Sequence, residues 1–114
     1  MHELGIAKDL FEIALLTSKK NRLKIITKIT VKIGEASGIE EDFLRHSFVD
    51  HLIPGTIAEN CRLEISKEKV KARCKNCSSF FSPEEVVFAC RSCRSKDIEI
   101  ISGKDVYITS IEGE

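Results

Sequence analysis

Several hallmarks of common protein classes are absent from this sequence of 114 residues. Its 18 basic and 18 acidic side chains give a formal net charge of zero, whereas a general nucleic-acid binder usually carries a clear basic excess. No apolar run approaches the length of a membrane-spanning helix, and the first residues lack the basic region of a secretory signal peptide. There is no glycine-rich phosphate loop, nucleophile–base motif or pair of spaced carboxylates. We therefore expect a cytoplasmic protein that is not an enzyme and has no contact with membranes.

The composition is that of a folded globular chain, with 42% hydrophobic and 32% charged residues. A chain of 114 residues suffices for one ordinary domain, or for two small ones if a metal ion stabilises the second.

Hydrophobic periodicity predicts two helices and at least four strands. Helices are expected over residues 2–20 and 39–52, and strands over 23–33, 61–66, 97–101 and 106–111. The apolar stripe of the first helix consists of Leu4, Ala7, Leu10, Phe11, Ala14 and Leu15, widened by Ile6 and Ile13. One face of the first strand is predicted to carry Ile25, Thr27, Ile29, Val31 and Ile33.

These elements predict an α+β fold in which two helices pack on a small mixed three-stranded sheet. The last strand is more apolar than a terminal tail needs to be, so we expect it to return to the first sheet. The cysteine-containing segment would then be an inserted, zinc-ribbon-like module. The predicted domains are residues 1–66 with 104–114, and residues 67–103.

Four cysteines form two CxxC pairs, Cys74 with Cys77 and Cys90 with Cys93, separated by twelve residues. This is the spacing of a four-thiolate metal site, in which each pair occupies a tight turn. The same residues could form disulfides, but Cys61 makes the number of cysteines odd and no signal peptide is present, which favours zinc. A closed site of four thiolates has no open coordination position, so its expected role is structural. Iron in a rubredoxin-like site is an alternative with the same ligands.

The residues around these pairs are notable in two ways. Knuckles of this kind often carry glycine after the second cysteine, and here Ser78 and Arg94 occupy those positions. Four thiolates around Zn²⁺ also carry a local charge of −2. Part of the surrounding basic patch is therefore expected to compensate the metal site; it consists of Lys67, Lys69, Lys71, Arg73, Lys75, Arg91, Arg94 and Lys96.

A second candidate metal site lies in the first three residues, Met1, His2 and Glu3. An imidazole next to a free α-amine can join it and the intervening deprotonated amides to chelate an ion in a square plane, an arrangement that favours Ni²⁺ or Cu²⁺ over Zn²⁺. Such binding releases protons, so it weakens as the pH falls. A histidine at position two is also often incidental, and these three residues alone leave both interpretations open.

The remaining candidates carry less information. His46 and His51 are five residues apart, about 140° around an α-helix, so they are not expected to form a two-histidine ligand face. Cys61 alternates with Leu63 and Ile65 and is expected to be a small buried apolar residue rather than a nucleophile.

Over essentially its full length the chain resembles the HypA/HybF family of hydrogenase nickel-incorporation proteins. The resemblance rests on matched features in order along the chain. They are the opening Met1-His2-Glu3-Leu4 with Ile6-Ala7, the segment Ile33-Gly34-Glu35 with Ser37-Gly38, Gly55-Thr56, the two CxxC pairs, and Ile101-Ser102-Gly103-Lys104 before an apolar strand. The cysteine knuckles lack the proline and glycine of many relatives.

The resemblance implies a nickel metallochaperone. It implies that the amino terminus of Met1, the side chain of His2 and nearby backbone amides reaching Glu3 bind Ni²⁺. It further implies structural zinc at Cys74, Cys77, Cys90 and Cys93. The expected partners are an accessory GTPase and the large-subunit precursor of [NiFe]-hydrogenase, with urease as a further target in some organisms.

A zinc-ribbon module that binds nucleic acid or a transcription partner is the alternative function. It would use the basic segment 67–73, with Phe80, Phe81 and Phe88 as stacking residues. The zero net charge argues against it, as does the need for these phenylalanines to cover a very small core. Nucleic acid is therefore not expected as a partner.

Overall fold

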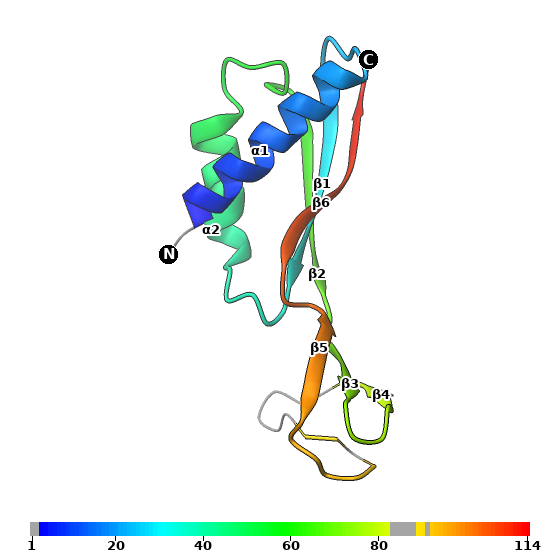
Figure 1. The fold of residues 1–114 in the computed structure, drawn as a ribbon. Coiled ribbons are helices and arrows are strands. Elements are labelled where there is room, and N and C mark those ends of the chain that lie inside the picture. Colours follow the sequence, from blue (N-terminus) through cyan, green and yellow to red (C-terminus); the bar gives the residue numbers. More distant parts are fainter. Residues whose placement is uncertain (1–2, 83–88, 91) are drawn as a thin grey trace.

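The computed structural model describes residues 3–82, 89–90 and 92–114. The elements are α1 (Glu3–Lys20), β1 (Ile26–Gly34), α2 (Glu41–His46), the π-helix η1 (Ser47–Leu52), β2 (Arg62–Glu68), β3 (Lys71–Cys74), β4 (Phe80–Phe81), β5 (Ile98–Ser102) and β6 (Val106–Gly113). They form an elongated molecule of 53 × 28 × 18 Å, with the helices at one end and the cysteine loops at the other (Figure 1).

Two three-stranded sheets follow one another along the long axis. The larger sheet has the order β2-β1-β6, in which β1 is parallel to β2 and antiparallel to β6. The smaller sheet has the order β4-β3-β5 and is antiparallel. The last strand therefore returns to β1, and the predicted α+β fold with a mixed sheet and an inserted cysteine module is confirmed (Figure 1).

The hydrophobic core lies between the helices and the larger sheet. The helix α1 contributes Ala7, Leu10, Phe11 and Ala14 to this core, and the second helical segment contributes Leu44 and Phe48. The strand β1 contributes Ile26, Ile29, Val31 and Ile33. Phe11 and Phe48 meet edge to face, with ring centroids 6.3 Å apart. Burial of each large apolar side chain contributes about 1.5–3 kcal/mol. This core therefore carries most of the stabilisation of the helices and the larger sheet.

The predicted core faces of the first helix and first strand need two corrections. Leu4 and Ile13 are about half exposed, so the buried stripe of α1 is narrower than its apolar pattern suggests. At the start of β1 the buried residue is Ile26, whereas the predicted Ile25 and Thr27 are exposed, because an irregularity in the pairing with β6 lies between Ile26 and Lys28. Such an irregularity shifts the side-chain alternation by one residue, which a strict period of two cannot anticipate.

The second helix also departs from the expected uniform α-helix. It is α-helical as far as His46 and continues as the π-helix η1, in which the Ile53 N–H donates to the Phe48 carbonyl oxygen at 2.9 Å. Hydrogen bonding from i+5 to i widens the turn and brings residues five apart close together. The prediction that His46 and His51 lie on different faces was therefore wrong, since their ring centroids are 5.2 Å apart.

The two sheets join where β2 passes into β3 and β5 passes into β6. At this junction the Glu68 carboxylate accepts hydrogen bonds from the Tyr107 hydroxyl and from the Gly103 N–H. The hydrogen bond from Tyr107 and then that from Gly103 lower the pKa of Glu68. The predicted domain boundaries, residues 1–66 with 104–114 and residues 67–103, stay a prediction.

Among the described residues, no helix combines the length and the apolar character needed to cross a membrane.

The glycine at the end of β1 provides a test of the junction. A Cβ on Gly34 would lie 2.3 Å from the carbonyl carbon and oxygen of Gly103, which are backbone atoms that cannot move aside cheaply. We expect Gly34→Ala to lower the free energy of unfolding by about 2 kcal/mol or more. Urea unfolding of the wild-type and variant proteins measures this change.

Gly5 is the matched control, because a Cβ there meets nothing within 4 Å and the residue lies inside α1. Gly5→Ala should raise the free energy of unfolding by up to about 1 kcal/mol through helix propensity. Equal effects of the two substitutions would contradict the close approach of Gly34 and Gly103.

Candidate metal centre

Each CxxC pair lies in a tight turn, and the two turns have the same hydrogen-bonding pattern. In the first turn the Ser78 N–H donates to the Cys74 carbonyl at 2.8 Å, and the Cys74 N–H donates to the Ser79 carbonyl at 2.8 Å. In the second, the corresponding bonds run from Arg94 to Cys90 and from Cys90 to Ser95, both at 2.9 Å. The repeated geometry explains why both pairs present their sulfurs in the same way.

The positions after the second cysteine of each pair have left-handed backbones. Ser78 has φ of 63° and Arg94 has φ of 61°. This is the conformation that glycine adopts without steric cost, so its absence from the sequence does not change the fold of the knuckle. It costs each residue about 1–2 kcal/mol.

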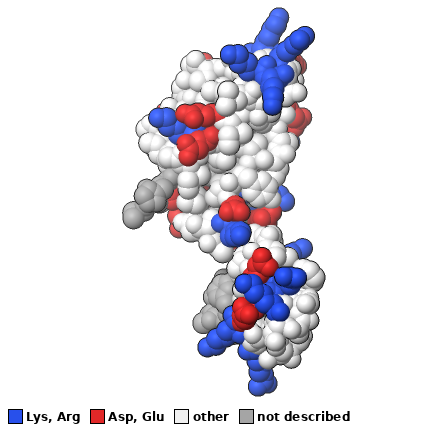
Figure 2. All heavy atoms as spheres, viewed as in Figure 1, with Lys and Arg blue, Asp and Glu red and all other residues white. Residues whose placement is uncertain are grey.

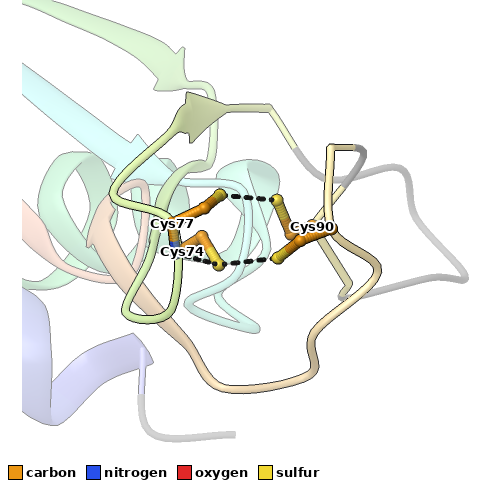
Figure 3. Close-up of side chains that lie close together, drawn as sticks. Cys74, Cys77 and Cys90 are labelled. Carbon is orange, nitrogen blue, oxygen red and sulfur yellow. Dashed lines mark hydrogen bonds between the residues drawn. The ribbon is translucent and has the colours of Figure 1, made fainter.

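The two turns bring all four thiols together. The Sγ atoms of Cys74, Cys77, Cys90 and Cys93 all lie within 4.8 Å of one another. The Cys74–Cys93 and Cys77–Cys90 sulfur pairs are 3.5 Å apart, and Figure 3 shows the labelled cysteines converging from two loops. A disulfide needs about 2.05 Å between sulfurs, whereas tetrahedral metal–sulfur bonds of about 2.3 Å place sulfurs roughly 3.8 Å apart. The spacing therefore suits a metal ion and not a disulfide.

Burial and hydrogen bonding distinguish the inner and outer thiols. Cys74 and Cys90, the first cysteine of each pair, are buried, whereas Cys77 and Cys93 are exposed. The Cys77 N–H points at the Cys74 sulfur at 3.4 Å, and the Ser92 N–H points at the Cys90 sulfur at 3.3 Å. These donors stabilise thiolates where hydrophobic surroundings alone would disfavour them.

The thiols differ in acidity as a result. The Ser79 hydroxyl and backbone N–H stabilise the Cys77 thiolate and, with the Cys90 thiol, lower its pKa to about 6. For Cys74, the Cys77 N–H lowers the pKa, but burial and the neighbouring thiols outweigh it and raise the pKa to about 11. The Ser95 backbone N–H lowers the pKa of Cys93. Near pH 7 the metal-free quartet is therefore only partly ionised, and a metal ion must displace protons from it.

Basic side chains surround this centre. In Figure 2, lysine and arginine side chains gather around the cysteine module and also at the opposite end of the molecule, where Lys19 and Lys20 close α1. The module's cations offset the charge of −2 that four thiolates and a divalent ion would carry. One of them, Arg73, is also paired with Glu99 at 3.4 Å.

Of the residues predicted to bind nickel, Met1 and His2 lie outside the described residues. Glu3 is buried at the start of α1, where its carboxylate accepts a hydrogen bond from the Glu40 N–H at 3.5 Å. This contact joins the beginning of α1 to the beginning of α2, and it could not be found from sequence spacing because the two residues are 37 positions apart.

Of the phenylalanines considered for nucleic-acid stacking, Phe80 is 70% exposed and Phe81 is half-buried, whereas Phe88 lies outside the described residues. Cys61 is half-buried, and burial raises the pKa of its thiol, as expected for a residue that is not a nucleophile. The sequence did not single out Ser79, whose hydroxyl and backbone N–H lower the pKa of Cys77, because it lies just outside the CxxC motif.

The fold and the thiol cluster define a class: a small α+β protein with an inserted module that can hold a metal ion through four cysteines. A family model described as "Hydrogenase/urease nickel incorporation, metallochaperone, hypA" matches residues 1–113. The chain belongs to this family, the HypA family.

Individual relatives agree with this assignment. The chain is 35% identical to the hydrogenase maturation factor HypA of Aquifex aeolicus over 114 residues, covering 100% of this chain and 98% of that protein. It is 33% identical to the protein of the same name from Wolinella succinogenes, covering 100% and 96%. The solution structure of the Ni metallochaperone HypA from Helicobacter pylori is similar in fold, with a TM-score of 0.78, 29% identity and coverage of 99% and 97%.

The left-handed residue of the first knuckle generates a prediction. Ser78→Gly removes the steric cost at φ 63° while keeping the N–H that bonds to Cys74. We expect the apparent zinc affinity to rise by up to about fivefold, equivalent to about 1 kcal/mol. Competition with a chromogenic chelator measures it. Lys75→Gly, in the same turn but without positive φ, should weaken binding slightly; a gain from both changes would contradict the argument.

The pKa differences generate a second prediction. Because the pKa of Cys74 is raised to about 11, its proton is present throughout pH 6–8 in the metal-free quartet and must leave when a metal binds. Apparent zinc affinity should therefore fall by about tenfold or more for each unit of pH decrease over this range. Chelator competition at several pH values, with proton release followed in weak buffer, measures the slope. An affinity independent of pH would contradict it.

Proposed function

We propose that this protein is a nickel metallochaperone that delivers Ni²⁺ during maturation of [NiFe]-hydrogenase, with urease as a further destination. The observation that carries the proposal is the family match, which spans residues 1–113 and includes the N-terminal residues and both cysteine pairs. Support also comes from relatives described as hydrogenase maturation factors and from a structural neighbour described as a Ni metallochaperone.

The nickel ligands in this proposal are the amine of Met1, the imidazole of His2 and backbone amides reaching Glu3. Amide and imidazole nitrogens suit the square-planar geometry that Ni²⁺ accepts and from which Zn²⁺ gains nothing. The buried Glu3, bonded to the Glu40 N–H, would anchor the last of these residues to the folded domain.

The cysteine quartet is proposed to hold zinc as a resident structural ion. All four ligands come from the protein, so no coordination position remains for a substrate, and Zn²⁺ is not redox-active. The protein's own side chains supply the rest: Cys74 and Cys90 lie inside the module, and backbone N–H groups are directed at their sulfurs. Zinc would supply the cohesion that the small module lacks.

Delivery is proposed to proceed by ligand exchange. A nickel site formed by the first residues of a chain can release its ligands one at a time to a partner, so moderate affinity is compatible with rapid transfer. The expected partners are an accessory GTPase and the precursor of the hydrogenase large subunit, acting in the cytoplasm. The protein itself is expected to catalyse no reaction.

Nucleic-acid binding is less well supported. The observation that supports it best is the exposed side chain of Phe80, which could stack on a base. Against it, Arg73 is paired with Glu99, Phe81 is half-buried and the chain has no net charge. Salt-dependent binding to nucleic acid is the measurement that would favour it.

A nickel titration of untagged protein that begins at Met1 tests the proposal. We expect His2→Ala to abolish tight nickel binding, because it removes the imidazole that closes the chelate. An extension placed before Met1 should have the same effect, since it removes the free amine. Calorimetry measures the nickel affinity, and elemental analysis should still find one zinc ion per chain in both variants. Tight nickel binding that survives both changes would overturn the proposed site.

A further inference from the structure

The π-helix η1 and the residue before it bring His46 into contact with both His51 and Asp50 on the surface of the helical end. The ring centroids of His46 and His51 are 5.2 Å apart, with the ring planes inclined at 84°. The Nδ1 atom of His46 also contacts a carboxylate oxygen of Asp50. All three side chains are exposed, with His46 59% and Asp50 53% accessible.

The backbone beneath this cluster is firmly anchored. Leu44, Ser47 and Phe48 are buried, and the Ser47 hydroxyl donates to the Phe43 carbonyl oxygen at 2.9 Å. Phe48 packs against Phe11 of α1. The exposed side chains of His46, Asp50 and His51 therefore project from a helical segment whose backbone is fixed by buried neighbours.

We propose that His46 and His51 form a two-imidazole site for a late first-row divalent metal ion, with Asp50 orienting His46. Imidazole is a good ligand for Ni²⁺, Cu²⁺ and Zn²⁺. With metal–nitrogen bonds of about 2.1 Å, two imidazoles in neighbouring positions on one ion have ring centroids roughly 5 Å apart. The observed separation of 5.2 Å lies in this range.

Asp50 has a distinct part in this arrangement. A histidine ligand commonly bonds through its second nitrogen to a carboxylate, which sets the ring orientation and raises the basicity of the ligating nitrogen. The contact between Asp50 and the Nδ1 atom of His46 leaves Nε2 of His46 as the ligand atom. Water completes the coordination, so the site is weaker than the cysteine quartet and exchanges its ion readily.

The site is separate from both metal sites of the proposed function. It lies in the helical part of the molecule, whereas the cysteine loops are at the far end (Figure 1). It does not use the first three residues of the chain. A titration with nickel should therefore detect one additional weak binding site per chain, which does not require the N-terminal amine.

The test is a nickel titration of the zinc-loaded protein carrying His2→Ala, followed through the Hε1–Cε1 NMR signals of the histidine rings. The signals of His46 and His51 should broaden together, with one midpoint in the micromolar to millimolar range. His51→Gln should shift the midpoint for His46 by at least about tenfold, because the second imidazole no longer binds intramolecularly. His46→Gln should do the same for His51.

Asp50→Asn should weaken binding by about tenfold or more, as expected for a carboxylate that orients a ligand. Glu12→Gln, which removes one exposed carboxylate from α1, is the matched control and should leave the midpoint unchanged. Different midpoints for the two histidines, or full affinity in either single histidine variant, would overturn the inference. Failure of the N-terminal proposal is distinguishable, because it concerns nickel binding that His2→Ala removes and that His46→Gln and His51→Gln leave intact.

Discussion

Convergence of four cysteine thiols is the interaction on which the smaller sheet and its loops depend. Among the described residues of the smaller sheet and its loops, the buried apolar side chains are Ala72, Cys74 and Cys90. So small a set cannot offset the conformational entropy of ordering the module. Coordination of a structural zinc ion by thiolates contributes about 10–16 kcal/mol in comparable small modules. The sulfurs thus occupy the place that a hydrophobic core fills in the helical half.

The helical half depends on a different constraint, the central position of β1. Its neighbours are β2, which follows the helices, and β6, which follows the cysteine module. The cysteine module is consequently attached to the two outer strands of the larger sheet, β2 and β6. The central strand, β1, contributes its buried side chains to the core beneath the helices. Glu68 fastens this junction by accepting hydrogen bonds from Gly103 and Tyr107, one residue on each side of the turn into β6. The two strands and this carboxylate form the physical connection between the end proposed to carry nickel and the end proposed to carry zinc.

The thiol cluster and the proposed histidine site differ in how far their side chains are buried. The thiols are partly buried and lie on hydrogen-bonded knuckles, which suits an ion that stays. The histidine pair of η1 is exposed on a helical turn, which suits an ion that exchanges. Because the two sites lie at opposite ends of the molecule, an ion can leave the histidine pair without disturbing the thiol cluster.

Local patterns in the sequence were sufficient for the two helical segments, the strands of the larger sheet and the cysteine quartet, because each depends on short-range spacing, whereas β3 and β4 were not predicted. CxxC dictates a knuckle, and the period of two or 3.6 dictates a strand or helix. Tertiary structure alone decided the shift from Ile25 to Ile26 in β1, the π-helical turn that joins His46 to His51, and the bond between Glu3 and Glu40. The first and last of these depend on contacts with a distant segment, which no local spacing records, and the π-helical turn departs from the period of 3.6 that the prediction for the histidines assumed.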